Sequence, residues 1–421
     1  MKIPRNKYVS SIQSFLNTSS KSILLLDWPR FAGKSTLLEH VYSTDDMWTG
    51  KKYYYSFDEH IGTKQFKDTH DFMQYMQIRH GVHFEEPWVL LLNEIQYSKN
   101  MWSILHDLIK KHKIALKIIA TSITQWEYKD FLQLREDDYE VITVHTLSFL
   151  EFLEYKWFHT AYINPYTFSG ILAEEIQPLL QEFLNWWAYP SVILAETEEE
   201  KKSALQHIIQ EIFIKDVTFW FQRDELAYFE NILTIVNDQY WQIYNKLRIK
   251  NTYDIPLRTV DRYMHFLENN YIISTIKHFY SDKKREVSHK QKAMLLDMWI
   301  KNYLHNMFRR RSHDHRTMMY MTMQELYKNL PHEAEIMAYK KVNWSEIDFI
   351  ISYKKNITPI VVWERDSTAL PKVFEWFIKQ YWNNVKQLFK TSISLSATKK
   401  YEKKEFYTIP YYLIWMIAKE M

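Results

Sequence analysis

One short segment contains residue types that could bind a phosphate group. Residues 24–38 read LLLDWPRFAGKSTLL, close to the pattern G-x-x-x-x-G-K-[ST] of phosphate-binding loops. Gly33 would let the backbone approach phosphate oxygens, Lys34 would contact the β and γ phosphates, and Ser35 would hold Mg²⁺. Trp28 stands where the pattern has its first glycine. The segment therefore predicts a nucleotide site with one irregular position.

We expect the whole loop and the first turn of the following helix to contact ATP. The predicted contacts are Trp28, Pro29, Arg30, Phe31, Ala32, Gly33, Lys34, Ser35 and Thr36. The alternative is a chance A-G-K-S sequence between a strand and a helix. The apolar run before the loop and the helical pattern after it favour the nucleotide site.

A second polar group ends another apolar run, LLLNEIQ at 90–96. Glu94 is predicted to be the catalytic residue that polarises the attacking water. Asn93 is predicted to lie on the metal side of the site together with Ser35. An amide can accept a hydrogen bond from a magnesium-bound water, but it carries no charge. We therefore expect weak Mg²⁺ binding or slow turnover.

Two hydroxyl residues, Thr121 and Ser122, follow the apolar run ALKIIA. A polar side chain at this position can sense the γ-phosphate, and we predict that Thr121 contacts the nucleotide. The alternative is a residue of a turn or a helix N-cap. The sequence alone favours neither interpretation.

The pattern of apolar residues predicts the elements that would position these side chains. Strands are expected at 22–27, 52–57, 88–92, 115–120 and 141–144, and helices at 5–17, 34–42, 63–79, 100–112 and within LSFLEFLEY. Strands that alternate with helices predict an α/β fold with a parallel sheet. After about residue 160, the pattern is mostly helical over 171–247. A helix and a strand pair are then expected within 256–280, and another strand pair at DFIISY and PIVVW.

Length and composition narrow the class of protein. The 421 residues predict two to four domains. No apolar run approaches the length of about 20 residues that a membrane helix needs. The absence of cysteine excludes disulfides and thiolate chemistry and favours a cytoplasmic protein. The net charge of +3 is too small to indicate nucleic acid binding by itself.

The chain resembles a family of prokaryotic AAA+-type ATPases that join a P-loop core to a C-terminal domain of unknown function. The resemblance covers nearly the whole chain. The resembling segments are IPRNKY, PRFAGKSTLL, NEIQ, HTLSFLEF, WAYPSV, IKDV, RTVDRYMHFLENNYII, LLDMWIKNYL and SEIDFI. The resemblance implies an ATPase core at 1–158, a helical lid at 159–222, a winged helix at 223–283 and a nuclease-like domain at 284–421. It also implies ATP and Mg²⁺ as cofactors.

The last domain of this family resembles PD-(D/E)xK nucleases, which place an Asp and an E-x-K on adjacent strands around a metal. Glu346 and Asp348 match the first of these strands. Val361 and Trp363 stand where the second strand should carry Glu and Lys. Because valine cannot hold a metal, we predict no nuclease activity. The family's Gly-Arg pair before the LSF helix, a candidate arginine finger, is also missing.

Glycine is scarce and tryptophan is abundant. The chain has 5 glycines and 16 tryptophans, whereas typical usage would give roughly 29 glycines. Trp28, Trp187, Trp299 and Trp344 stand where the family has glycine. Some bacterial lineages read the UGA codon as glycine, so our hypothesis is that these tryptophans are glycines translated with the wrong code. A UGG codon at position 28 would refute it for that site. A true Trp28 would crowd the loop and weaken ATP binding.

These observations predict an ATP-binding protein, a slow ATPase whose nucleotide state moves C-terminal domains that bind a protein partner. One alternative is a non-hydrolysing, nucleotide-gated scaffold, which Asn93 favours. Another is a DNA-binding protein whose winged helix presents Arg258, Arg262, Tyr263 and His265.

Overall fold

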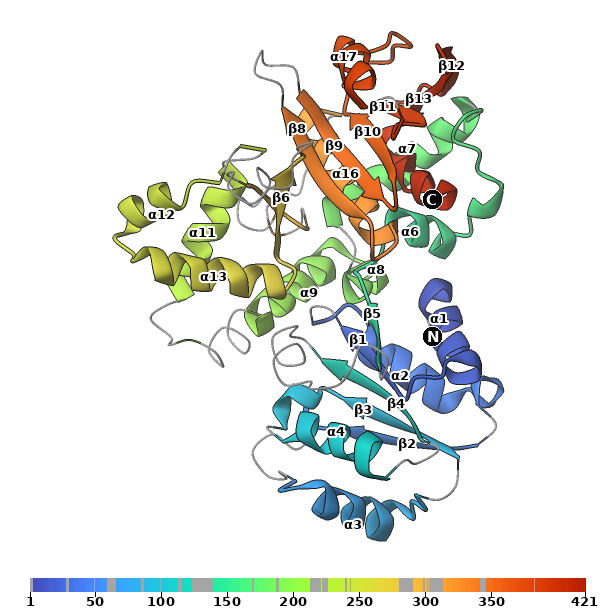
Figure 1. Ribbon diagram of the computed structural model, residues 1–421, viewed down its shortest axis with the longest axis vertical. Coiled ribbons are helices and arrows are strands. Elements are labelled where there is room, and N and C mark those ends of the chain that lie inside the picture. The colour runs from blue at the N-terminus through green and yellow to red at the C-terminus, as the bar shows by residue number, and fades with distance from the viewer. Residues whose placement is uncertain are drawn as a thin grey trace. The chain divides into compact units, whose positions relative to one another are not determined.

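The structure is a computed structural model of the chain (Figure 1). It describes residues 3–27, 30–48, 50–58, 66–84, 87–98, 100–112, 116–122, 139–168, 170–186, 189–212, 221, 226–238, 241–242, 244–279, 291–297, 300, 302, 313–340, 346–381 and 383–421. The chain divides into two compact units, Met1–Thr146 and Leu147–Met421. Each unit has its own β-sheet.

The first unit is built on a five-stranded sheet in which all paired strands are parallel. Its strand order is β2-β3-β4-β1-β5. The strands are β1 (Ile23–Asp27), β2 (Lys51–Ser56), β3 (Trp88–Asn93), β4 (Leu116–Ser122) and β5 (Tyr139–Thr143). Every residue of β1 and β3 is buried, which explains why both read as continuous apolar runs. The five predicted strands and the parallel sheet are confirmed.

Helices flank this sheet (Figure 1). They are α1 (Asn6–Thr18), α2 (Lys34–Ser43), α3 (Thr69–His80) and α4 (Met101–His112), with short 3-10 turns η1 (Asp45–Met47) and η3 (Ile95–Tyr97). Side chains of α3 and α4 share a hydrophobic core with β2, β3 and β4. The start predicted for α3, residue 63, is wrong. The helix begins at Thr69 because the Asp68 carboxylate caps it by accepting a hydrogen bond from the Asp71 N–H.

The second unit contains an eight-stranded mixed sheet with the order β12-β13-β11-β10-β9-β8-β6-β7. Its strands are β6 (Ile273–His278), β7 (Lys292–Leu295), β8 (Glu335–Lys340), β9 (Glu346–Tyr353), β10 (Asn356–Val361), β11 (Gln387–Ser392), β12 (Ala397–Tyr401) and β13 (Lys404–Pro410). The predicted pair DFIISY and PIVVW is confirmed as β9 and β10, which are antiparallel. The strand pair predicted within 256–280 is corrected, because β6 pairs with β7 and β8, which both lie beyond that range.

The described residues over 171–247 are mostly helical, as predicted. The α-helices of the second unit follow in chain order. They are α6 (Phe149–Tyr155), α7 (Gly170–Trp186), α8 (Pro190–Leu194), α9 (Glu198–Gln210), α11 (Leu226–Asp238), α12 (Lys246–Tyr253), α13 (Leu257–Asn269), α16 (His315–Asn329) and α17 (Lys372–Tyr381), with 3-10 segments η4 (Thr160–Tyr162) and η7 (Tyr411–Glu420). Within the described part of the chain, no helix is both long enough and apolar enough to cross a membrane.

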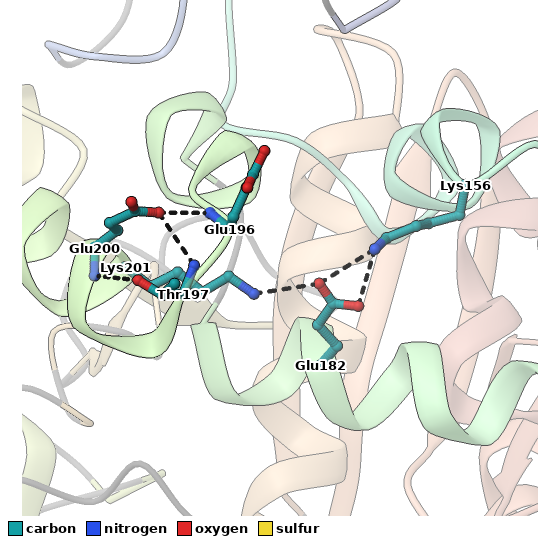
Figure 2. A network of polar contacts seen from close by, with 6 residues as sticks. All are labelled: Lys156, Glu182, Glu196, Thr197, Glu200 and Lys201. Carbon is teal, nitrogen blue, oxygen red and sulfur yellow. Dashed lines mark hydrogen bonds and ion pairs between the residues drawn. The ribbon is translucent and has the colours of Figure 1, made fainter.

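A polar network connects three of these helices (Figure 2). The Glu182 carboxylate of α7 lies 3.0 Å from the ammonium of Lys156, just after α6, and 3.5 Å from that of Lys201 in α9. The start of α9 is fixed by a capping box in which the side chains of Thr197 and Glu200 bind each other's backbone N–H. Partly exposed ion pairs contribute about 0–1 kcal/mol each. The network therefore orients the helices, and apolar packing supplies most of their stability.

Candidate nucleotide-binding site

The predicted phosphate-binding loop connects β1 to α2. Gly33 caps α2 with a φ of 99°, a left-handed conformation that suits glycine. Lys34 is the first residue of α2 and is only 3% exposed. A helix N-terminus beside a buried lysine favours an anion. Trp28 and Pro29 lie outside the described residues, so their contacts with nucleotide stay predictions.

The order of the strands brings three predicted site residues together. The parallel strands β1, β3 and β4 end at the same edge of the sheet, where ligands of such sheets bind. There the Asn93 amide oxygen accepts hydrogen bonds from the hydroxyls of Ser35 and Thr121, each at 2.9 Å. The residues predicted to contact the metal and the γ-phosphate therefore form one cluster.

Asn93 also connects this cluster to β2. Its amide nitrogen donates to the Ser56 hydroxyl at 2.9 Å, and that hydroxyl in turn donates to the Asp58 carboxylate. Sequence reasoning missed both Ser56 and Asp58. The indication available was the polar end of the second predicted strand, SFD. Asp58 supplies a carboxylate at the far end of this chain of hydrogen bonds, whereas Asn93 itself is neutral.

Glu94 directly follows β3 in an unusual backbone conformation. Its φ is 57°, and its N–H donates to the Thr121 hydroxyl at 2.8 Å. Thr121 belongs to β4, so the interpretation of this residue as a helix cap or turn is wrong. The Glu94 side chain is 8% exposed, and its carboxylate accepts a hydrogen bond from the side-chain amide of Gln96. Gln96 was part of the segment NEIQ but received no predicted role.

Two arginines hold the loop in place. Arg30 donates to the hydroxyl of Tyr97 in η3, and its guanidinium lies 5.6 Å from the centre of that ring. Arg5, from the segment IPRNKY, donates to the Ala32 carbonyl at 2.9 Å. Phe31, which lies between Arg30 and Ala32 in the loop, has a φ of 65°. The loop is therefore tied both to the segment after β3 and to the residue just before α1.

Thr36, the last predicted contact, is exposed on α2. It lines a cavity of about 390 Å³ whose other lining residues are Glu39, His40, Tyr42, Ser43 and Tyr54. None of these residues belongs to the cluster around Asn93. A contact between Thr36 and nucleotide stays a prediction.

The side chains present fit a nucleoside triphosphate with Mg²⁺. Lys34 and the start of α2 suit the phosphates, and the oxygens of Ser35 and Asn93 are of the type that Mg²⁺ prefers. Among the described residues, no group of three or more His, Asp or Glu side chains could hold a metal. This is compatible with Mg²⁺, which is commonly bound through one or two protein groups and substrate phosphates.

The second cluster named by the sequence lies in the other unit. Glu346 of β9 pairs with the ammonium of Lys292 in β7, and the Asp348 carboxylate accepts from the Val362 N–H at 2.7 Å. Burial raises the pKa of Asp348 to about 7 and lowers the pKa of Lys292. Val361 ends β10. Lys292 was not predicted, because it comes from a distant strand.

Two parts of the chain match known family models. Residues 20–153 match the family model of an AAA domain, and residues 177–311 match that of a domain of unknown function (DUF8612). Uncharacterized protein MJ1544 of Methanocaldococcus jannaschii is 23% identical over 257 residues, which are 59% of this chain and 54% of that protein. The chain thus matches about half the length of this relative.

A solved structure of C. elegans PCH-2 aligns with 49% of this chain and 67% of its own, with 12% identity and a TM-score of 0.25, too low to support a structural argument. The AAA-domain match spans the loop, β3 and β4. Together with the parallel sheet, it supports a P-loop AAA-type ATPase domain that binds nucleotide.

Proposed function

We propose that this chain binds ATP with Mg²⁺ and hydrolyses it slowly, and that the nucleotide state moves C-terminal domains that bind a protein partner. The observation that carries the proposal is the cluster at one edge of the parallel sheet. Ser35, Asn93 and Thr121 are joined by two hydrogen bonds of 2.9 Å, next to the buried Lys34. These residues come from three separate segments, α2, β3 and β4, and the fold brings them together beside the phosphate-binding loop.

Each residue has a distinct role in this proposal. Lys34 neutralises the β and γ phosphates, and Ser35 holds the metal, which offsets negative charge on the phosphates when bound. Thr121, near the end of β4, contacts the γ-phosphate. Glu94 polarises the attacking water. Because Asn93 carries no charge, it attracts the metal less than an aspartate would, and turnover is slow.

Substitution of Lys34 by alanine tests the proposal. We expect Lys34→Ala to weaken ATP binding by at least about 100-fold, since a buried charge-assisted contact to phosphate is lost. Isothermal titration with ATP measures binding, and phosphate release measures turnover. The control is Lys110→Ala, which removes an exposed lysine of α4. Wild-type protein that binds no ATP, or equal binding by both variants, would refute the proposed function.

A non-hydrolysing nucleotide-gated scaffold is the second candidate. Asn93, the residue predicted on the metal side, is neutral, and its amide oxygen already accepts from two hydroxyls. ATP bound without phosphate release would select this function over the first.

The C-terminal part supports a winged helix followed by a nuclease-like domain. The order α11-α12-α13-β6-β7, with β6 and β7 antiparallel, is typical of winged helices. Arg258 and Arg262 of α13 are exposed, whereas Tyr263 is buried in the core. A salt-dependent mobility shift with duplex DNA would favour the DNA-binding alternative. We propose cytoplasmic localisation and domain limits at 158, 222 and 283.

We also propose that the nuclease-like part is inactive. The carboxylates of Glu346 and Asp348 are already paired with Lys292 and with the Val362 N–H. No acidic residue stands at Val361 to complete a metal site. Cleavage of plasmid DNA in Mg²⁺ or Mn²⁺ by the purified chain would refute this.

A further inference from the structure

Gln96 is a buried amide beside the carboxylate of Glu94. Its side chain is 6% exposed, and its Nε2 donates to a carboxylate oxygen of Glu94. A carboxylate only accepts hydrogen bonds, so the amide nitrogen must be the atom that contacts Glu94, and the amide oxygen is left for another donor. That oxygen is buried and has no hydrogen-bond partner among the described residues.

The segment that carries Gln96 is fixed to the phosphate-binding loop. The Tyr97 N–H donates to the Glu94 carbonyl at 3.2 Å, and the Ser98 N–H donates to the Ile95 carbonyl at 3.0 Å, which closes η3. The Tyr97 hydroxyl accepts from Arg30 of the loop. Gln96 therefore lies between two residues that are both anchored at the nucleotide site.

We propose that Gln96 is a second water-orienting residue for ATP hydrolysis, acting together with Glu94. This inference rests on the proposed function. The two O–H groups of one water match the two acceptors that Glu94 and the Gln96 amide oxygen offer. A buried acceptor without a donor is unfavourable, and a water held at this point satisfies it.

The step is a simple displacement. The water oxygen bonds to the γ-phosphorus while the bond from that phosphorus to the bridging oxygen breaks, giving ADP and inorganic phosphate. Glu94 accepts the water proton and later releases it to solvent. Gln96 takes up no proton. Its amide nitrogen holds the Glu94 carboxylate, and its amide oxygen would accept the second O–H of the water and so orient it for attack.

The test is Gln96→Met in the full chain, which keeps side-chain length and removes both polar atoms. We expect kcat to fall by about 10- to 100-fold, while the dissociation constant for ATP changes by less than about twofold. The matched control is Ser98→Ala. The Ser98 hydroxyl is buried on the same segment and has no partner among the described residues. This control should change neither quantity.

Each outcome decides the question. An unchanged kcat in folded Gln96→Met, checked by its melting temperature, overturns the inference. A weaker ATP affinity with unchanged kcat also overturns it, because Gln96 would then act only in binding. Wild-type protein that binds ATP without hydrolysing it overturns the inference and leaves nucleotide binding intact. Wild-type protein that binds no ATP overturns the proposed function as well.

Discussion

The two sheets of the protein differ in the partners that they give to polar and charged side chains at their strand ends. In the first unit, parallel strands bring polar residues to one edge, where a loop and a helix N-terminus add donors for an anion. In the second unit, β9 is antiparallel to both β8 and β10. Glu346 and Asp348 at the start of β9 therefore meet the ends of its neighbours, and Lys292 and a backbone N–H occupy their carboxylates.

The two clusters differ in the partners of their buried polar side chains. Near Lys34, the hydrogen-bonded partners around Asn93 are neutral hydroxyls and an amide, which a ligand can displace at moderate cost. Around Asp348, the partners are permanent parts of the fold. Burial, together with the nearby Glu346, raises the pKa of Asp348 to about 7. Polar residues at strand ends thus favour binding in one topology and stability in the other.

The largest effect that would test this comparison is expected at Lys292. Lys292→Met should lower the free energy of unfolding by about 3 kcal/mol. The reason is that the Glu346 carboxylate, part of a largely buried ion pair, then lacks the positive charge that compensates it. The Lys292 side chain is 4% exposed, and its ammonium also lies 4.2 Å from the centre of the Trp241 ring. Urea unfolding measures the loss, and ATP binding should not change.

The control for this change is an ion pair of the same unit that is exposed to solvent. Lys246 pairs with Asp261, and their side chains are 50% and 43% exposed. Lys246→Met should cost less than about 1 kcal/mol. Equal losses in both variants would show that the cluster around Glu346 is not a stabilising element.

An effect of about the same size, but dependent on pH, is expected from Glu325 of α16. Its carboxylate accepts from the Phe149 N–H at 2.8 Å at the start of α6, and burial raises its pKa to about 7. Because the folded carboxyl holds its proton more tightly than the unfolded chain does, its contribution to stability is largest below about pH 4.5 and is lost as pH rises through about 7. The loss amounts to about 3 kcal/mol.

Glu325→Gln should remove this dependence, because the amide keeps an acceptor for Phe149 and cannot ionise. At pH 5, where the wild-type carboxyl is mostly protonated, the variant and the wild type should be about equally stable. At pH 8 the variant should be more stable by about 2–3 kcal/mol. Urea unfolding at the two pH values measures the difference, and parallel pH curves for the two proteins would contradict the pKa assigned to Glu325.

The local parts of this structure could be predicted from the sequence, and the contacts that depend on strand order could not. Apolar runs and the A-G-K-S segment located β1, β3, β4 and α2, because burial and glycine geometry act over a few residues. The hydrogen bond from Asn93 to Ser56 requires β2 to lie beside β3, which the order of strands along the chain does not specify. The pair of Lys292 and Glu346 similarly requires strands that are distant in sequence.

The tryptophans named in the glycine hypothesis, Trp28, Trp187, Trp299 and Trp344, lie outside the described residues. A different tryptophan, Trp157, bears on it directly. Trp157 has a φ of 68° and is 90% exposed. It follows α6 in a Schellman motif, in which its N–H donates to the Glu154 carbonyl at 3.0 Å and the next N–H donates to the Leu153 carbonyl at 3.0 Å. Glycine is the usual residue at this position of the motif.

The smallest effect is expected at Trp157. The experiment tests the cost of its left-handed backbone conformation rather than the contacts of its side chain. An exposed indole contributes little packing, while a Cβ in the left-handed region costs about 1 kcal/mol. Trp157→Gly should therefore be more stable than Trp157→Ala by about 1 kcal/mol in urea unfolding, since alanine removes the indole and keeps the Cβ. A UGA codon at position 157 would extend the glycine hypothesis to a fifth site. Equal stability of the two variants would mean that the motif tolerates a side chain, and the scarcity of glycine would then need another cause.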